Sequence, residues 1–215
     1  MKSTRAIKVI TSLSVGVVLL ASLSWIGLGQ VSGRIDRISV FAGLDNRPEK
    51  TSKALNYLLV GSDTREGLTK EEMKALRVGS TKTAAGGRSD TMLLVHISKK
   101  RDKAFLVSLP RDSLVTIPAH LSADGKTQIP DRENKLNAAF AFGGAPLLIE
   151  TIERATNLQM DHYIEVSFAG FAGIVNALGG IEVCTKVDID DPKSHLVLSA
   201  GTHTLDGIEA LKYVR

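Results

Sequence analysis

The stretch GRSDTMLLV, residues 87–95, places an arginine and an aspartate two positions apart, just before a run of apolar residues. Apolar runs of this length, bounded by polar residues, are typical of buried strands. Two other apolar runs carry a similar pair at their far ends: residues 56–60 lead into GSDTR, residues 61–65, and residues 104–109 lead into PRD, residues 110–112. Because arginine and aspartate are seldom buried unpaired, three strand ends of this kind indicate a binding site.

The relative positions of these ends follow from the turn that joins two of the strands. Residues 99–102 form a charged turn, KKRD, which predicts a hairpin. In an antiparallel pair, the start of one strand lies beside the end of the next. We therefore expect Arg88, Asp90, Arg111 and Asp112 to share one edge of the sheet.

Composition limits the classes to which the chain can belong. Its 215 residues, 43% of them hydrophobic and 23% charged, suit one folded domain with an appendage. The net charge of +4 is too small an imbalance to indicate a nucleic-acid partner. The single cysteine, Cys184, excludes an internal disulfide and a cysteine-based zinc site. We interpret it either as a small buried hydrophobe or as a thiol whose partner is absent from this sequence.

The N-terminal segment is interpreted as a membrane anchor. Residues 9–28 are apolar apart from a few Ser and Thr, and this length matches the hydrocarbon core of a bilayer. Basic residues before this run predict a cytoplasmic tail at 1–8, followed by a single transmembrane helix at 9–29. A juxtamembrane linker at 30–54 and an extracytoplasmic domain at 55–215 would follow. The alternative is a cleaved signal peptide, which normally has a shorter apolar core and a small-x-small cleavage site.

The predicted extracytoplasmic domain mixes strand and helix patterns, as α/β folds do. We expect strands at 56–60, 91–98, 104–109, 162–168 and 181–187, helices at 71–76, 134–142, 145–156, 169–178 and 207–215, a loop at 117–133 and a hairpin at 196–205. The last helix has neither a capping residue nor a closing segment. We therefore expect the sequence to be truncated within it.

The residues at the strand ends suit a phosphorylated ligand and a metal ion. Asp63 and Asp90 supply carboxylate oxygens, which Mg²⁺ prefers, usually with phosphate oxygens completing its shell. Arg65, Arg88 and Arg111 offer planar donor groups that match phosphate at two points. The alternative is that each arginine pairs with a neighbouring aspartate at a strand end, since such pairs are common and nearly neutral in energy.

Other polar residues have weaker interpretations. Lys135 and Asn137 start a helix and are either solvated first-turn residues or phosphate contacts. Asp161 and His162 are interpreted as structural, because no second His or Cys lies at a metal-ligand spacing, and residues 188–191 as a solvated turn. No G-x-G-x-x-G, P-loop lysine or G-x-S-x-G motif is present, so a dinucleotide fold, a P-loop and a serine hydrolase receive no support.

Seven motifs, in order, make the sequence similar to the LytR-CpsA-Psr family. They are LLVGSDTR at 58–65, GRSDTM at 87–92, SLPRD at 108–112, KLNAAFAFGG at 135–144, DHYIEV at 161–166, FAGIVNALGGIEV at 171–183 and LDGIEALKYVR at 205–215. The resemblance implies an α/β domain whose mixed central sheet is flanked by helices around a hydrophobic pocket for a polyprenyl chain. It also implies a membrane-anchored, Mg²⁺-dependent phosphotransferase that moves a glycopolymer from a polyprenyl-pyrophosphate carrier to peptidoglycan, with polyprenyl-pyrophosphatase activity as a further expectation.

The resemblance also implies roles for individual residues. It assigns Mg²⁺ binding to Asp63 and Asp90, and catalytic roles to both of them and to Arg111. The expected pyrophosphate-binding residues are Arg65, Arg88, Arg111, Lys135 and Arg215, with Asp112 beside them. The expected lining of the lipid pocket is Phe140, Leu147, Leu148, Ile152, Phe168, Phe171 and Ile174, at least half of which we expect to be ordinary core. The later arginines and paired glutamines of the family, and a downstream partner for Cys184, are absent from the sequence.

Two other functions remain as alternatives. One is a non-catalytic binder of polyprenyl phosphate, and the other is an envelope-linked transcriptional attenuator. The tail before the predicted transmembrane helix is only residues 1–8, which cannot hold a DNA-binding module. The first alternative is distinguished by whether the purified protein transfers glycan or only retains polyprenyl phosphate.

Overall fold

The computed structural model describes residues 37–64, 68–76 and 89–214. Val40–Arg215 forms one compact unit. The predicted cytoplasmic tail and transmembrane helix lie outside the described residues. In the part of the chain that is described, no helix is both long and apolar enough to cross a membrane.

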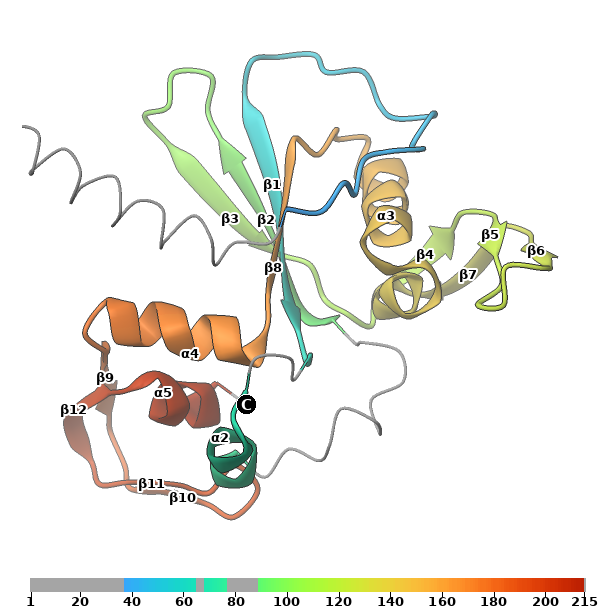
Figure 1. The fold of residues 1–215 in the computed structure, drawn as a ribbon. Coiled ribbons are helices and arrows are strands. Elements are labelled where there is room, and N and C mark those ends of the chain that lie inside the picture. The colour runs from blue at the N-terminus through green and yellow to red at the C-terminus, as the bar shows by residue number, and fades with distance from the viewer. Residues whose placement is uncertain (1–36, 65–67, 77–88, 215) are drawn as a thin grey trace, which may run out of the picture. The chain divides into compact units, whose positions relative to one another are not determined.

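A four-stranded mixed sheet lies at the centre of the unit that begins at Val40. Its strands are β1 (Leu55–Ser62), β2 (Ser89–Ile97), β3 (Ala104–Ser108) and β8 (His162–Val166), in the order β3, β2, β1, β8 (Figure 1). β2 is antiparallel to both β1 and β3, whereas β8 is parallel to β1. The mixed α/β class and the hairpin between β2 and β3 are therefore confirmed.

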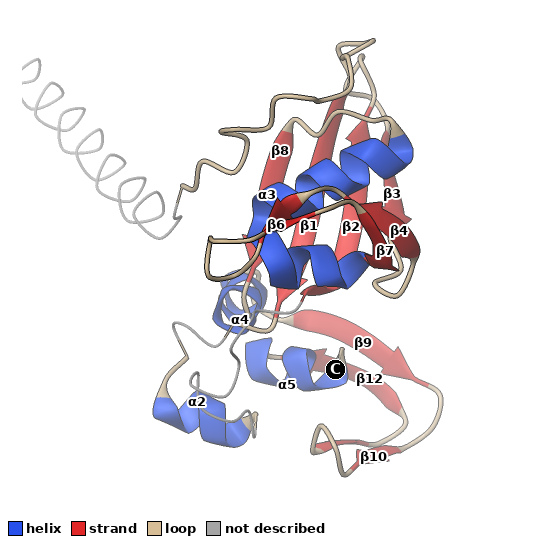
Figure 2. Cartoon of the chain, turned by 90° about the vertical axis from the view of Figure 1, so that its right-hand side faces the viewer, coloured by secondary structure: helices blue, strands red, loops and turns tan. Residues whose placement is uncertain are grey.

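One face of this sheet packs against helix α3 (Leu136–Thr156), which lies across it in Figure 2. In the register of β1 and β2, Leu58 lies opposite Leu94 and Val60 lies opposite Met92. All four side chains are buried in one core cluster with the apolar residues of α3. Each buried side chain of this size stabilises the fold by roughly 1.5–3 kcal/mol, so the alternating pattern of β1 determines which face meets the helix.

Helix α3 consists of two segments joined at Gly143 and Gly144, whose backbone angles are not helical. Gly144 has a φ of 64°, a conformation that glycine adopts at little cost. Pro146 lies in the first turn of the second segment, where its missing N–H is tolerated. The two predicted helices separated by a Gly-Gly pair are confirmed as these two segments.

The predicted loop at 117–133 is wrong in part, because short strands within it form an antiparallel ribbon. The pairs are β4 (Leu114–Ile117) with β7 (Arg132–Lys135), and β5 (His120–Leu121) with β6 (Gln128–Ile129). Pro118 and Pro130 lie between the paired segments. Proline has no backbone N–H to donate, and at these positions the strand pairing needs none. The β-branched residues of β4 were the signal that favoured a strand.

The C-terminal part is made of two helices and two further strand pairs. They are α4 (Phe168–Ala177), β9 (Ile181–Thr185), β10 (Ile189–Asp191), β11 (Leu196–Leu198), β12 (Gly201–Leu205) and α5 (Gly207–Tyr213). β12 pairs with β9 and β11 pairs with β10, so the predicted hairpin within 196–205 is wrong.

The turn between β10 and β11 lies at 192–195, where Asp191 accepts hydrogen bonds from the backbone N–H groups of Lys193 and Ser194. The predicted solvated turn at 188–191 is therefore mostly strand.

Two smaller predictions have opposite outcomes. The helical patch at 71–76 is confirmed as α2 (Lys70–Ala75), which starts with a capping box between Thr69 and Glu72. Cys184 lies on β9 and is exposed, so its interpretation as a buried hydrophobe is wrong. Its position in the strand places it on the outer face, since positions two residues apart share a face.

The N-terminal strap, residues 40–50, belongs to the folded unit. Val40 is buried in the main core cluster, and Phe41 and Leu44 pack against it. The predicted linker at 30–54 therefore extends too far, because apolar side chains from Val40 onward have a place in the core.

An ion pair fastens the strap to the end of α3. Arg47 donates from Nε to Oε2 of Glu153 at 3.0 Å and from Nη2 to Oε1 at 2.6 Å. The Glu153 side chain is only 2% exposed, and its Oε1 also accepts a hydrogen bond from the Met160 N–H at 2.6 Å. A buried carboxylate is thus satisfied by partners from two other parts of the chain, Arg47 and Met160, as buried charges require.

Replacing Arg47 with alanine should reduce the free energy of unfolding by about 2–3 kcal/mol, because it leaves the Glu153 carboxylate buried without its charged partner. Urea denaturation followed by circular dichroism measures this loss. Arg154→Ala is the matched control, since Arg154 pairs with Asp131 at the exposed surface and should change stability little. A loss in Arg47→Ala no larger than that in the control would contradict the role of the pair.

Gly207→Ala should disrupt the packing of α5 against α4, because an added Cβ would lie 2.2 Å from the carbonyl oxygen of Ala172. We expect a loss of roughly 1–3 kcal/mol in the free energy of unfolding, as in other overpacked sites. Gly173→Ala is the control, since no heavy atom lies within 4 Å of its added Cβ. It should raise stability by up to about 1 kcal/mol, and equal effects of the two changes would show that the close approach is not maintained in solution.

Candidate functional site

The end of β1 and the start of β2 meet at an irregular pairing. Gly61 lies opposite Thr91, but the next residue of β1, Ser62, lies opposite Ser89. Asp90 is therefore the additional residue of a β-bulge, a feature that often redirects side chains next to functional sites. Asp63 directly follows Ser62, so the backbone brings the two predicted metal-binding aspartates to the same end of the sheet. The side chain of Asp90 lies outside the description.

The end of β3 reaches the same end of the sheet. The Leu109 N–H donates to the carbonyl oxygen of Met92 at 2.9 Å, which extends the β2–β3 pairing toward Thr91. Arg111 and Asp112 follow two and three residues later. The backbone thus brings the predicted residues Asp90, Arg111 and Asp112 together, and Arg88 lies outside the described residues.

The start of α3 is tied to the loop after β3 by two backbone hydrogen bonds. The Leu136 N–H donates to the carbonyl oxygen of Ser113 at 2.9 Å, and the Asn137 N–H donates to that of Arg111 at 3.0 Å. Lys135, at the N-cap position of the helix, is therefore held beside Arg111. These bonds satisfy N–H groups that a helix start cannot satisfy internally.

Lys135 and Arg111 both pair with Asp112. The Lys135 Nζ lies 2.8 Å from Oδ1 of Asp112, and the Arg111 Nε lies 3.6 Å from its Oδ2. The hydrogen bond from Lys135, with smaller contributions from both cations, holds the pKa of Asp112 below its ordinary value. Since the three side chains are 49–63% exposed, they can exchange these contacts for contacts with an anionic ligand at little cost.

The simple pairing that the sequence allowed as an alternative therefore exists for Arg111 and Asp112. It does not exclude phosphate binding, because an exposed pair is worth little, whereas a bidentate contact between arginine and phosphate is among the stronger polar interactions.

The donor groups at the end of β1 and the start of β2 fit a Mg²⁺ ion. Among the described side chains, no group of three or more His, Cys, Asp or Glu could hold a metal ion. Two aspartates alone are nevertheless a usual protein contribution to a Mg²⁺ site, because this ion keeps several waters and takes further oxygens from phosphate. Ser89, which the sequence did not single out, is fully buried and its hydroxyl has no hydrogen-bond partner among the described residues. A buried hydroxyl without a partner among the described residues, at the end of the sheet where the backbones of Asp63 and Asp90 lie, fits a hydrated cation.

Two other predicted pyrophosphate-binding residues, Arg65 and Arg215, lie outside the described residues. Their assignments stay predictions. Asn137, the other candidate at the start of α3, uses its backbone N–H for the bond to Arg111.

The residues predicted to line one lipid pocket do not share one environment. Leu147, Leu148 and Ile152 are buried in the main core cluster, and Phe140 packs against it. Phe171 packs against a second cluster, formed by α4, α5 and the C-terminal strands. Of the remaining two, which are both on α4, Phe168 is half-buried and Ile174 is 53% exposed.

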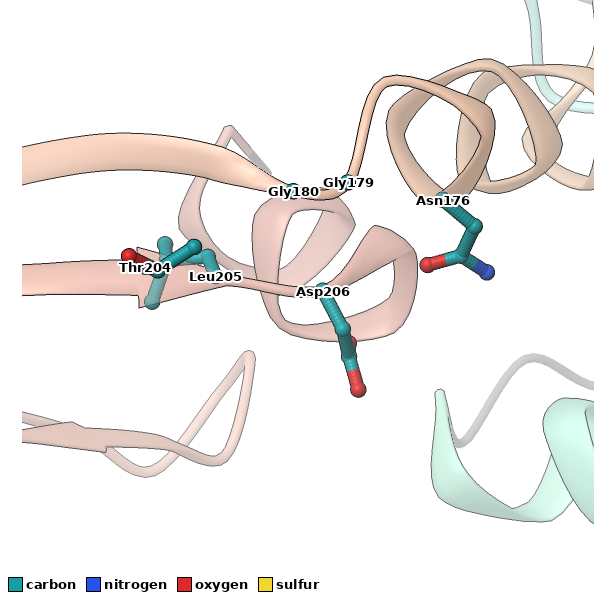
Figure 3. A pocket seen from close by; sticks show the side chains of 6 residues that line it. All are labelled: Asn176, Gly179, Gly180, Thr204, Leu205 and Asp206. Carbon is teal, nitrogen blue, oxygen red and sulfur yellow. The ribbon is translucent and has the colours of Figure 1, made fainter.

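An open pocket of about 320 Å³ does occur in the C-terminal part (Figure 3). It is lined by Asn176, Gly179, Gly180, Thr204, Leu205 and Asp206. The carboxylate of Asp206 accepts hydrogen bonds from the N–H groups of Ile208 and Glu209, and the amide oxygen of Asn176 accepts one from Gly207. These polar groups cap α5 and attach it to α4, so the pocket belongs to the structure of this junction.

Asp161 and His162 have structural contacts, as the sequence indicated. Asp161 accepts a hydrogen bond from the backbone N–H of Asn56 at 2.9 Å and pairs with Lys50. Although burial raises its pKa, the hydrogen bonds from Lys50 and Asn56 hold that pKa below the ordinary value. His162 stacks on Tyr57, with ring centroids 4.5 Å apart.

Comparison with known proteins gives consistent matches. The model of the LytR_cpsA_psr family matches residues 33–215. A protein of Corynebacterium glutamicum named as a probable cell wall biosynthesis protein, LcpB, is 40% identical over 160 residues, which are 74% of this chain and 35% of that protein. The polyisoprenyl-teichoic acid–peptidoglycan teichoic acid transferase TagT of Bacillus subtilis is 36% identical over 168 residues, 75% of this chain and 45% of that protein.

Solved structures agree with these matches. The LytR-CPS2A-psr family protein YwtF (TagT), solved with bound octaprenyl pyrophosphate lipid, superposes with a TM-score of 0.54 and 29% sequence identity. The superposition covers 85% of this chain and 60% of that one. The chain spans less than half the length of the two curated relatives described above.

Replacing Lys135 with methionine should raise the pKa of Asp112 toward the ordinary carboxyl value of about 4, because the largest cause of its lowering is the hydrogen bond from Lys135. NMR titration of the side-chain carboxyl carbon measures this pKa. Asp124 is an internal control, since its pKa is lowered chiefly by the Ser122 hydroxyl and should not change.

The same titration has a consequence for stability. A carboxyl group whose pKa is lowered on folding stabilises the fold above its unfolded pKa and loses this contribution as the pH falls through the folded pKa. The wild type should therefore lose the contribution of Asp112 only on acidification below pH 4, by a small amount because the pair is exposed. An unchanged pKa of Asp112 in Lys135→Met would show that the contact does not persist in solution.

Proposed function

Because the chain belongs to the LytR_cpsA_psr family, we propose that it is a phosphotransferase that moves a glycopolymer from a polyprenyl-pyrophosphate carrier to peptidoglycan. One observation carries the proposal: the ends of β1, β2 and β3 and the start of α3 meet, and bring Asp63 and Asp90 to the same end of the sheet as Arg111 and Lys135. The names of relatives support it, since TagT is named a teichoic acid transferase and one solved relative holds octaprenyl pyrophosphate.

Arg111 and Lys135 are proposed to bind the pyrophosphate. Arginine presents a fixed donor fork that matches two phosphate oxygens, and lysine adds a compact positive charge. Asp112 holds both cations side by side in the absence of a ligand. An incoming pyrophosphate replaces this carboxylate as their partner, so the cations need little rearrangement when the carrier binds. Arg65, Arg88 and Arg215 are proposed as further pyrophosphate contacts, on the resemblance alone.

Asp63 and Asp90 are proposed to hold Mg²⁺, which when bound would offset the charge that develops on the phosphate oxygens. The bulge supports this role, because Asp90 is the additional residue in the pairing of β1 with β2 and bulges often occur next to functional sites. We assign to one of these two aspartates a second role, as acceptor of the proton that the attacking hydroxyl loses.

The proposed reaction is a substitution at phosphorus. A sugar hydroxyl of peptidoglycan attacks the phosphorus linked to the glycopolymer and forms a new P–O bond. The bond between that phosphorus and the bridging oxygen breaks, and polyprenyl phosphate leaves. Positioning and electrostatic stabilisation suffice for such a step, and no covalent intermediate with the protein is needed. With water in place of the sugar hydroxyl, the same step would be the expected pyrophosphatase activity.

We further propose that the reaction takes place at the outer face of the cytoplasmic membrane. The apolar segment at 9–29 would anchor the chain there, with residues 1–8 in the cytoplasm. Of the apolar side chains expected to contact the carrier, Phe140 is the strongest candidate, because it is half-buried in the first segment of α3, close in sequence to Lys135.

The test is transfer of radiolabelled glycan from a polyprenyl-pyrophosphate donor to peptidoglycan by the full chain in lipid nanodiscs. Arg111→Ala and Asp90→Asn should each lower the transfer rate by about 100-fold or more, in line with the loss of one electrostatic contact to a transition state. The melting temperature of Arg111→Ala should stay close to that of the wild type, because the Arg111 side chain is 49% exposed, and Asp90→Asn nearly preserves the size of the side chain. Lys100→Ala, in the turn at the opposite end of β2 and β3, is the control and should keep full activity.

Wild-type transfer by Asp90→Asn at all Mg²⁺ concentrations would rule out the proposed metal site. Tight retention of polyprenyl phosphate by the wild type without any transfer, detected by mass spectrometry, would support a non-catalytic binder instead.

A further inference from the structure

Ser89 stands out among the polar residues of the core. Its side chain is fully buried, and its hydroxyl has no hydrogen-bond partner within the part of the chain that the structure describes. Buried hydroxyl groups are almost always bonded to protein or to ordered water, so an exception calls for a specific explanation. No helix cap, turn or strand ladder of the described residues uses this hydroxyl. Its burial is therefore not explained by a role in the fold of these residues.

The β-bulge determines where this hydroxyl lies. In regular pairing, Asp90 would follow Met92 and Leu94 on the face of β2 that packs against α3. Because the register shifts at Asp90, Ser89 lies opposite Ser62 instead. Both serines are buried, which makes them the polar end of an otherwise apolar face. Ser89 is thus the immediate neighbour of Asp90 in sequence and lies across from the residue that precedes Asp63.

The two serines differ in one respect. The Ser62 hydroxyl lies 2.8 Å from the hydroxyl of Thr64 and is hydrogen-bonded to it. The Ser89 hydroxyl makes no such contact with any residue that the structure describes. The two serines lie opposite each other and are similarly buried. The Ser62 hydroxyl therefore serves the fold, whereas the Ser89 hydroxyl is available to a ligand.

We propose that the Ser89 hydroxyl hydrogen-bonds a water in the coordination shell of a divalent cation held by Asp63 and Asp90, and thereby positions that cation. The proposal rests on the function proposed above. A water suits a fully buried hydroxyl better than a bulky phosphate group does, because of its size. Mg²⁺ keeps several of its waters when bound by one or two carboxylates, and hydrogen bonds from the protein to such ligands orient them. Ser89 is therefore a positioning residue, not a direct ligand.

The test is the affinity of the full chain for Mn²⁺ alone, measured by the electron paramagnetic resonance signal of free Mn²⁺, after treatment with EDTA and its removal. Mn²⁺ replaces Mg²⁺ because both prefer oxygen ligands in an octahedral shell. Ser89→Ala should weaken Mn²⁺ binding by about 10-fold or more, the usual cost of losing a hydrogen bond to a metal ligand. Its melting temperature without metal should match that of the wild type, because no hydrogen bond within the protein is lost.

Ser62→Ala is the matched control. It removes a hydroxyl that is bonded to Thr64, so it should lower the melting temperature without metal by roughly 2–4 °C and leave Mn²⁺ affinity within twofold of the wild type. Asp63→Asn should abolish Mn²⁺ binding, which would show that the measured Mn²⁺ occupies the site proposed at Asp63 and Asp90.

Each outcome has a definite meaning. Mn²⁺ affinity in Ser89→Ala within twofold of the wild type would overturn the inference, and so would a lower melting temperature without metal, since the hydroxyl would then be bonded within the protein. If the wild type itself binds no Mn²⁺, the metal site of the proposed function fails and the inference fails with it. If the wild type binds Mn²⁺ in competition with Mg²⁺ while Ser89→Ala binds it equally well, the inference alone fails.

Discussion

The antiparallel pairing of β1 with β2 is the constraint on which the rest of the structure depends. It brings Leu58 and Val60 to the face that packs against α3 and, in the same register, brings the end of β1 beside the start of β2. A slip by one residue would move every apolar side chain of β1 to the other face. Burial of the core therefore also fixes the backbone positions of Asp63 and Asp90 at one end of the sheet. No other element is needed to bring these two residues together.

Helix α3 connects the cationic half of the site to the same core. Both of its segments contribute side chains to the main core cluster, and its first two N–H groups bond to the loop after β3. Lys135 is thus carried by a rigid element, whereas Arg111 and Asp112 lie in a short loop with half-exposed side chains. This division suits ligand exchange: the backbone positions are determined by the fold, while the side chains can change partners at a low energetic cost.

The sequence was sufficient for the central strands and for the meeting of their ends, because apolar runs of strand length and one charged turn determine both. It was insufficient where pairing depends on distant residues. The ribbon between Leu114 and Lys135 has strands of two to four residues, too short for a periodic signal. Nothing in the motif GRSDT tells whether Ser89 or Asp90 lies opposite Ser62, since a bulge depends on the partner strand. The ion pair between Glu153 and Arg47 likewise joins residues that are 106 positions apart in the sequence.

The two ends of β1 differ in how completely their polar groups are used. At the first end, Asn56 bonds to Asp161, to the carbonyl oxygen of Gln159 and to His96, so the backbone and the side chain both have partners. At the second end, the Ser89 hydroxyl has none among the described residues. Folding alone favours the first arrangement, because an unpaired buried polar group costs free energy. Departures from such local rules are expected at functional sites, and this contrast supports the proposal that the second end, where the aspartates also lie, binds a ligand.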